Sequence, residues 1–395
     1  MPDAQNSMRF RTRSRARFPI AAVVASLPLV LAACSGSGPQ SALEPQGATA
    51  RDIDGLWRLV FAIAVIVFIL VAGVMVVAMI RFRERKGDDR EPKQLHGNTT
   101  LEIVWTIIPA VLLAVVAVPT LDVLFDVRDE PEGARLDVAV VGHQWWWEFT
   151  YPQFVDEDGR PLTTANELHI PVEEEVYLTM TSADVIHSFW VPPLQGKRDL
   201  VPGRFTNLKF IADAEVATQD FGFGPGVVLG QCAEFCGLAH ADMRIRVFVH
   251  TSEEFQAWVD GQLAPAAVPA AGSGLAAAGY ETFSVVCTAC HQALVSGPDG
   301  VQALGSGRVL TVDGVDVDAA IAPDLTHFGS RTTFAGASID ATREHLVRWL
   351  ANPSDLKPMT PERNDIAAGR ILGMPSFGLS DEEIDGLVEL LKGWQ

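Results

Sequence analysis

Two long stretches without a charged residue lie in the first third of the chain, at residues 59–80 and 103–121. A helix rises about 1.5 Å per residue, so each stretch can cross the roughly 30 Å hydrocarbon core of a membrane. A buried core helix is the alternative, but two such stretches lie close together and the rest of the chain has a soluble pattern. We predict transmembrane helices at about residues 56–80 and 101–125, within a segment of residues 34–125.

The first 33 residues have the pattern of a secretory signal. Five arginines precede an apolar stretch, residues 18–33, which is followed by a Ser/Gly/Pro-rich spacer. The sequence Leu31-Ala32-Ala33-Cys34 resembles the lipobox of bacterial lipoproteins. This resemblance implies that residues 1–33 are removed and that Cys34 carries a lipid. The alternative is an ordinary signal peptide followed by a chance cysteine.

The loop between the two apolar stretches is basic. Lys and Arg in short loops mark the cytoplasmic side of a membrane, so this loop is expected inside the cell. Everything after about residue 126 is then extracytoplasmic, and the chain is a multi-pass protein of a bacterial cell membrane. The basic residues of the loop are Arg81, Arg83, Arg85, Lys86, Arg90 and Lys93.

Beyond the apolar stretches, the residue pattern changes twice. Apolar and polar residues alternate in parts of residues 135–250, which predicts strands of a small sandwich or barrel in an all-β domain, residues 126–262. Residues 263–279 are rich in Ala, Pro and Gly, which indicates a flexible linker that would let the last domain swing. Residues 280–395 are predicted to be all-α, with a capping box at Ser380 and Glu383 before the last helix.

The formal net charge of −19 arises mainly after residue 126. An acidic soluble part argues against nucleic acid as a partner. It would attract a basic protein, although it could equally serve solubility alone.

A short segment holds four soft or borderline metal donors. Cys232, Cys236, His240 and Met243 lie within one loop, and His187 follows a strand-like run upstream. Thiolate and thioether ligands together with imidazole favour copper over hard ions. Zinc is the alternative, since Cys/His loops often bind it; the methionine and the extracytoplasmic setting argue against zinc.

The motif Cys287-Thr288-Ala289-Cys290-His291 is a c-type haem attachment sequence. Two thiols three residues apart can bond the haem, and the adjacent histidine can ligate the iron; zinc binding or thiol redox chemistry is the alternative. The sixth ligand must come from downstream, where Met374 is preferred over Met359 and His327. A thioether ligand would raise the haem potential.

His187 and the run from Cys232 to Met243 are similar to the dinuclear copper (CuA) signature of subunit II of haem–copper cytochrome c oxidases. Residues 323–331 resemble the haem domain fused behind that subunit in caa-type oxidases. The resemblance implies a cupredoxin-like CuA domain and a class I cytochrome c domain. It also implies the copper ligands: bridging thiolates of Cys232 and Cys236, one imidazole each from His187 and His240, and weaker bonds from Met243 and the Glu234 carbonyl.

The same resemblance implies three further roles. Trp145, in the aromatic run of residues 142–149, corresponds to a tryptophan near the surface that passes electrons to copper; packing in a β core is the alternative. The Glu234 side chain corresponds to a ligand of magnesium at the junction with subunit I. Glu102 corresponds to the mouth of a proton pathway, although it could be a simple interfacial carboxylate.

The resemblance implies an electron-entry subunit of an aerobic, proton-translocating terminal oxidase. Electrons would pass from a cytochrome c donor, soluble or membrane-bound, through haem c and CuA to subunit I, where oxygen is reduced. The partners are then subunit I, the other oxidase subunits, the donor and membrane lipid. Two alternatives are a CuA/haem c subunit of a nitric oxide reductase and a membrane-tethered copper-binding or redox-sensing module.

Overall fold

The structure is a computed structural model, and it describes residues 38–83, 94, 96–128, 130–131, 133–270, 272, 274–359 and 373–395. The chain divides into two compact units, Met1–Gly38 and Pro39–Gln395, and the account below concerns the second. The predicted signal segment, Cys34 and part of the basic loop (Arg85, Lys86, Arg90 and Lys93) lie outside the described residues.

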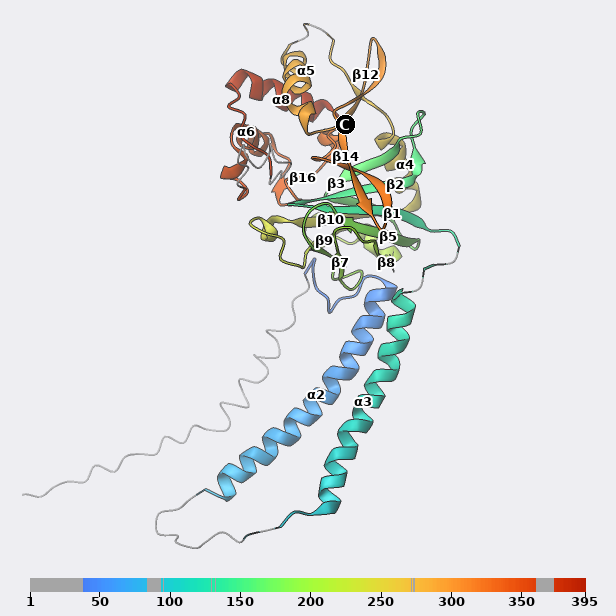
Figure 1. The fold of residues 1–395 in the computed structure, drawn as a ribbon, viewed down its shortest axis with the longest axis vertical. Helices are drawn as coiled ribbons and strands as arrows, with labels where there is room; N and C mark the ends of the chain where they lie inside the picture. Colours follow the sequence, from blue (N-terminus) through green and yellow to red (C-terminus); the bar gives the residue numbers. More distant parts are fainter. Residues whose placement is uncertain are drawn as a thin grey trace, which may run out of the picture. The chain divides into compact units, whose positions relative to one another are not determined.

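Two long helices, α2 (Ala48–Arg81) and α3 (Thr99–Arg128), contain the apolar stretches (Figure 1). Their apolar side chains are exposed, and each helix is long and apolar enough to cross a membrane. Both extend beyond the predicted ranges. Helix α2 starts early because its first turns are attached to the following domain: Arg51 forms an ion pair with Asp213, and Gly47 forms a β-bridge with Ala212.

Two five-stranded sheets follow, with the strand orders β3-β2-β1-β5-β8 and β4-β10-β9-β6-β7. Most neighbours are antiparallel, but β1 pairs with β5 and β10 with β4 in parallel. The strands are β1 (Leu136–His143), β2 (Trp146–Val155), β3 (Pro161–Ala165), β4 (Glu167–Pro171), β5 (Glu175–Ser182), β6 (His187–Trp190), β7 (Arg198–Leu200), β8 (Thr206–Ile211), β9 (Val227–Cys232) and β10 (Arg244–His250). Two short 3-10 helices, η1 (Ala214–Thr218) and η2 (His240–Asp242), lie in the connections.

The predicted alternation is visible in the burial of these strands. Along β10, every second side chain from Ile245 to Val249 is buried. Between the sheets, Phe189 packs edge-on against Trp147 and Phe149, at centroid distances of 5.5 and 6.3 Å. Helix α4 (Ser252–Gln262), with a capping box, completes what we call the β domain, residues 136–262. An all-β sandwich of the cupredoxin type is confirmed.

The last part of the chain, from Ala266 to Gln395, is called the C-terminal domain. Its helices confirm the cytochrome-like pattern, including the capping box at Ser380 and Glu383. They are α5 (Leu275–Val286), α6 (Arg343–Ala351) and α8 (Asp381–Gly393), with the short 3-10 helices η3 (Cys287–Ala289), η4 (Phe328–Ser330) and η5 (Pro353–Asp355).

Helices α5 and α8 cross at a pair of glycines. A Cβ on Gly279 would lie 2.0 Å from the carbonyl oxygen of Gly386, so only glycine permits this approach. Next to the crossing, Phe283 packs edge-on against Trp394 at 4.9 Å. The crossing fixes the end of α5, where the haem attachment motif begins.

Residues 293–320 lie within the segment predicted to be all-α but form two hairpins. These are β12 (Ala293–Gly297) with β13 (Gly300–Leu304), and β14 (Gly307–Val312) with β15 (Val315–Ala320). The second turns at Asp313-Gly314, where both φ angles are positive, as the tightest hairpin turns require. Short pairs also form between β11 (Ala266–Ala267) and β12, and between β16 (Thr333–Phe334) and β17 (Ile339–Asp340).

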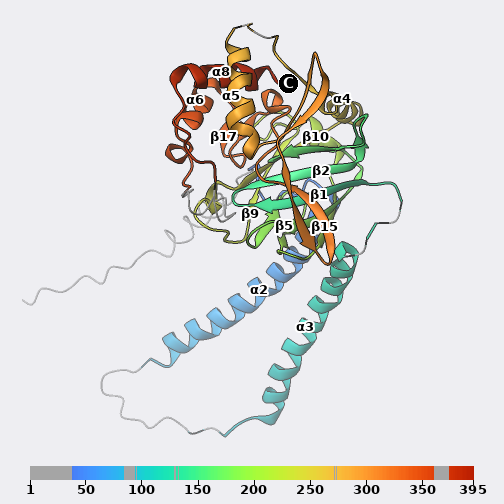
Figure 2. The same cartoon turned by 45° about the horizontal axis from the view of Figure 1, so that its top comes forward.

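These hairpins alter the picture of the linker. Strand β11 lies inside the predicted linker and is paired, and α5 starts at Leu275, before the predicted end of the linker at residue 279. The β14–β15 hairpin lies beside β1 and β2 of the β domain (Figure 2), where the backbone N–H of Ala320 donates to the Glu148 carboxylate at 3.0 Å. In this structure the two domains are in direct contact, so the C-terminal domain is docked on the β domain and is not held away from it by the linker.

The glycine crossing yields a stability prediction. Gly279→Ala should loosen the α5–α8 contact, because the methyl group has no space, and overpacking of this kind should lower the protection of the α5 and α8 amides by roughly ten- to a hundred-fold. Hydrogen exchange on the full chain measures this. Gly261→Ala is the matched control, since Gly261 is helical but has open space around it; alanine there should leave protection equal or higher. Equal protection in both variants would contradict the crossing.

Candidate metal and haem sites

The soft donors of the β domain meet in one loop between β9 and β10. Cys232 ends β9, and its backbone N–H donates to the carbonyl of Met243 at 2.9 Å, so the loop closes on itself. Gly237 has a φ of +114°, and a Cβ there would lie 2.9 Å from Nε2 of Gln144. The loop therefore lies close to the residues just before β2, and both the backbone angle and the close contact at Gly237 require glycine.

The donor atoms lie at distances suited to one polynuclear site. The two thiol sulfurs are 3.8 Å apart; Cys232 Sγ is 3.9 Å from Nδ1 of His187, and Cys236 Sγ is 3.5 Å from Nδ1 of His240. The Met243 sulfur is 3.7 Å from Cys236 Sγ. The five residues predicted from sequence are thus brought together, and three of them also form a group that could hold a metal ion.

His187 is oriented by its neighbours. Nε2 of His187 lies 2.9 Å from a carboxylate oxygen of Asp184, which leaves Nδ1 facing the thiols. The Trp147 ring packs against the edge of the imidazole. Burial alone would lower the pKa of His187, but the hydrogen bonds with Asp184 and Cys232 outweigh it and raise the pKa. A carboxylate behind a ligating histidine fixes the ring and strengthens it as a donor.

The two thiols have unequal acidities. The hydrogen bond between the two thiols lowers the pKa of Cys232, and contacts with His187 and the backbone lower it further. The pKa of Cys236 is raised in turn by its hydrogen bond with Cys232, by burial, and by repulsion from a second negative charge at Cys232. A cation between the two sulfurs would remove that repulsion. Two adjacent thiolates, two imidazoles and a thioether fit copper better than zinc, which prefers four ligands without thioether.

The predicted oxygen groups have different positions. The Glu234 carbonyl lies 3.2 Å from Cys232 Sγ, at the donor cluster, whereas the Glu234 side chain is exposed. Glu102 is exposed in the first turn of α3. Among the described residues, its carboxylate forms no hydrogen bond or ion pair with the donor cluster.

The haem attachment motif lies at the end of α5. Cys287 and Cys290 are half-buried in and after η3, and Nδ1 of His291 lies 2.8 Å from the carbonyl of Pro323. The N–H therefore donates to that carbonyl, and Nε2 remains free for a ligand. Burial lowers the pKa of His291, although the bond to Pro323 opposes the shift. A neutral imidazole is the form that binds a metal.

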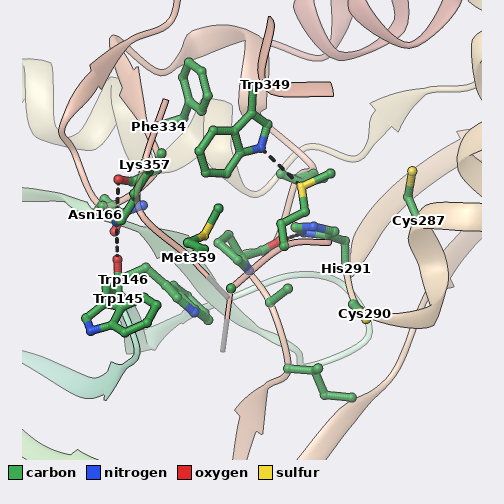
Figure 3. A pocket seen from close by; sticks show the side chains of 18 of the residues that line it. Trp145, Trp146, Asn166, Cys287, Cys290, His291, Phe334, Trp349, Lys357 and Met359 are labelled. Atoms are coloured by element: carbon green, nitrogen blue, oxygen red, sulfur yellow. Dashed lines mark hydrogen bonds between the residues drawn. The ribbon is translucent and has the colours of Figure 1, made fainter. Parts of the chain in front are cut away.

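A cavity opens in front of His291, and we call it the interdomain cavity because both domains line it. Figure 3 shows Cys287, Cys290 and His291 with Trp145 and Trp146 around it. Its walls are mostly apolar, as is usual for a cofactor pocket. Arg331 also lines it, with an Nε that is buried and has no hydrogen-bond partner in the described part of the chain. An apolar cavity with one unpaired guanidinium N–H fits a flat macrocycle that carries carboxylates.

Of the three candidates for the sixth ligand, two line this cavity. Met374 accepts a hydrogen bond from Nε1 of Trp349 at 3.2 Å and packs against the core of the C-terminal domain. Met359 is 7 % exposed and belongs to the core cluster of the β domain. His327 lines a different cavity, beside Glu148 and Arg160. The packing thus favours Met374.

Trp145 departs from the expectation of a position near the surface. Its side chain is only 4 % exposed, because the C-terminal domain covers it, and its Nε1 donates to the carbonyl of Cys236 at 3.0 Å. Gln144 donates to the same carbonyl at 2.7 Å. Trp145 thus touches the copper loop on one side and the interdomain cavity on the other.

Sequence reasoning missed two residues at this site, Trp349 and Lys357. Trp349 contacts Met374, as described, and Lys357 is buried against the carbonyl of Trp145. No motif marks either residue.

Comparison with known proteins gives three family matches. Residues 40–123 match the transmembrane domain of cytochrome c oxidase subunit II, residues 136–249 its periplasmic domain, and residues 276–394 cytochrome c. Two similar relatives are both named cytochrome c oxidase subunit 2. The one from Alkalihalophilus pseudofirmus is 32 % identical over 373 residues, which cover 93 % of this chain and 94 % of the relative. The one from Bacillus subtilis is 31 % identical over 381 residues, which cover 94 % and 96 %.

Three matched segments in this order explain the three parts of the fold. The relatives match along almost their whole length, so the cytochrome c domain is not an addition peculiar to this chain. The chain therefore belongs to the cytochrome c oxidase subunit II family, as a membrane-anchored subunit of a terminal oxidase with a cytochrome c domain behind its periplasmic domain.

Proposed function

We propose that this chain is the electron-entry subunit of its oxidase, passing electrons from a cytochrome c donor through haem c and CuA to the oxygen-reduction site in subunit I. The supporting observation is the position of Trp145. It lines the cavity of His291 and donates to the carbonyl of the copper-loop residue Cys236 at 3.0 Å. One side chain therefore contacts both sites.

The proposed copper ligands are the thiolates of Cys232 and Cys236, the imidazoles of His187 and His240, the Met243 thioether and the Glu234 carbonyl. The close approach of these donors supports the set. A dinuclear copper centre would supply a one-electron carrier. The protein buries the two thiols, the His187 imidazole and the Met243 thioether, which keeps the reorganisation on electron transfer small.

The proposed haem site uses Cys287 and Cys290 for covalent attachment and His291 and Met374 as axial ligands. Covalently bound haem c would supply the second one-electron carrier. The protein's part is to orient His291 through Pro323 and to place the Met374 sulfur beside the Trp349 N–H. An exposed carboxylate at Glu234 would add a magnesium ligand at the junction with subunit I, and Glu102 would lie at the mouth of a proton pathway.

The domain limits, the multi-pass topology and the lipid on Cys34 also belong to this proposal. Residues 1–33 would be a lipoprotein signal, 34–125 the anchor, 126–262 the CuA domain, 263–279 the linker and 280–395 the cytochrome domain. Both cofactor domains would face the outside of the bacterial membrane, with subunit I and the cytochrome donor as partners. The names of the relatives favour an oxidase over a nitric oxide reductase.

The copper ligand set makes a direct prediction. Cys232→Ser or Cys236→Ser should abolish the mixed-valence EPR signal of the purified chain and lower its copper content from two ions, because one thiolate cannot form a bridged core. Cys287→Ser is the matched control, expected to impair haem attachment and leave the copper signal intact. A mixed-valence signal that survives either loop substitution would refute the bridging role.

The axial ligand makes a second prediction. Met374→Leu keeps the side-chain volume but removes the thioether, and should lower the haem potential by roughly a hundred millivolts or more. Redox titration measures it, and the copper EPR signal should not change. Met359→Leu is the matched variant from the same cavity and should keep the wild-type potential. The reverse pattern would mean that Met359 is the ligand.

The order of carriers tests the function itself. After mixing the purified complex with reduced cytochrome c in a stopped-flow instrument, haem absorbance should change first and copper absorbance later. Trp145→Phe should slow the copper phase several-fold and leave the haem phase and haem potential unchanged. Trp258→Phe, a substitution in the β domain next to His169 rather than the copper loop, is the control. Copper reduced before haem would rule out the proposed order.

A further inference from the structure

The ammonium group of Lys357 is enclosed where the two domains meet. The residue is 2 % exposed, and its Nζ lies 2.8 Å from the carbonyl oxygen of Trp145, 3.0 Å from that of Asp242 and 2.7 Å from that of Ala335. Three acceptors match the three protons of an ammonium. Among the described residues, no carboxylate forms an ion pair with Lys357. Figure 3 shows the lysine next to Trp145.

Two of these carbonyls belong to segments that position the copper donors. Trp145 donates to the carbonyl of Cys236, and Asp242 lies in η2 between His240 and Met243. The third, from Ala335, belongs to the C-terminal domain. The ammonium group of Lys357 therefore links a backbone carbonyl of the C-terminal domain to one carbonyl in the copper loop and to one beside it, at Trp145.

Gly336 gives a second, independent indication that the two domains approach each other closely at Lys357. A Cβ on Gly336 would lie 2.6 Å from Nζ of Lys357 and 2.7 Å from the carbonyl oxygens of both Trp145 and Asp242. Its φ of +78° also favours glycine. The Gly336 carbonyl accepts from the backbone N–H of Arg244 at 2.8 Å, so the two domains meet backbone to backbone.

Other buried polar groups pair across the same boundary. The Glu167 carboxylate, in a residue only 2 % exposed, accepts from the backbone N–H and hydroxyl groups of Thr332 and Thr333, at 2.6 to 3.0 Å for one oxygen. On the β14–β15 hairpin, Arg308 lies 3.1 Å from His143. Buried polar groups are costly when unpaired, so these partners favour one docked arrangement.

We propose that Lys357 and Gly336 form a lock that holds the C-terminal domain on Trp145, so that electrons enter the copper site from haem c and not directly from an external donor. The inference rests on the proposed function. Docking covers Trp145 and keeps the haem cavity against it. Undocking would uncover the tryptophan and separate the two carriers. Lys357 is thus a positioning residue: it acts through the carbonyls of Trp145 and Asp242.

Breaking the lock should have opposite effects on two rates. Lys357→Met removes the ammonium donor from the carbonyls of Trp145 and Asp242, while the Ala335 carbonyl keeps its bond from the Ser338 hydroxyl. Loss of a charge-assisted hydrogen bond shifts a docking equilibrium by roughly ten- to a hundred-fold. Gly336→Ala forces the backbones apart. In both variants, haem-to-copper transfer should slow, and direct reduction of copper by a small external reductant should become faster.

The experiment uses the purified oxidase complex. Haem c is reduced by a light pulse from a photoactive ruthenium complex, and copper absorbance gives the transfer rate. Direct copper reduction is measured by mixing the fully oxidised complex with a small external reductant and following the copper and haem phases separately. Hydrogen exchange at residues 240–246 and 332–337 reports docking. The controls are Lys392→Met, which removes a surface lysine with one carbonyl partner, and Gly159→Ala, whose φ is also +78° but whose surroundings are open.

The proposal expects both lock variants to show slower transfer and faster exchange, with unchanged haem potential and copper EPR, while both controls match the wild type. Wild-type transfer and exchange in Lys357→Met would overturn it, even if Gly336→Ala had an effect. Loss of either cofactor from both variants would also overturn it, because a lock between folded domains is not needed to bind copper or haem. If the wild type itself shows no haem-to-copper transfer, the proposed function fails, while the exchange data still decide whether Lys357 docks the domains.

Discussion

The carbonyl of Cys236 accepts hydrogen bonds from both Gln144 and Trp145, and the rest of the site is arranged around this contact. It ties the loop of soft donors to the start of β2. It also turns the Trp145 ring toward the interdomain cavity, where the C-terminal domain buries it. The backbone of the loop, rather than its side chains alone, thus connects the two sites.

The two cofactor sites are built on the same physical rule, that a ligand must be held by a second partner. Asp184 holds His187 from behind, Pro323 holds His291, and the Trp349 N–H holds the Met374 sulfur. In the two histidines the partner occupies one ring nitrogen and leaves the other for a metal, whereas the Trp349 N–H donates to the Met374 sulfur itself and fixes its position. Ligands fixed in this way change little in position when an electron arrives or leaves.

Features that depend on residues close together in the chain could be predicted from the sequence, and contacts between distant segments could not. The copper loop, the attachment motif, the apolar helices and the capping box at Ser380 were all readable, because each depends on residues close together in the chain. The burial of Trp145 was not, since it depends on a domain more than a hundred residues away. The β14–β15 hairpin was missed although Asp313-Gly314 is a strong turn signal between β-forming residues. The burial of Lys357 could not be predicted, because a lysine is expected at the surface unless the groups that accept its hydrogen bonds are known.

The central claim is that the C-terminal domain is docked on the β domain with its cavity against Trp145, and not tethered loosely by its alanine-rich linker. Pulsed EPR of the oxidised complex, detecting the dipolar coupling between the ferric haem and the mixed-valence copper centre, measures this most directly. The account predicts one narrow distribution of haem-to-copper distances, and the same distribution whatever the composition of the frozen solvent. A broad distribution, or one that changes with the medium, would contradict it.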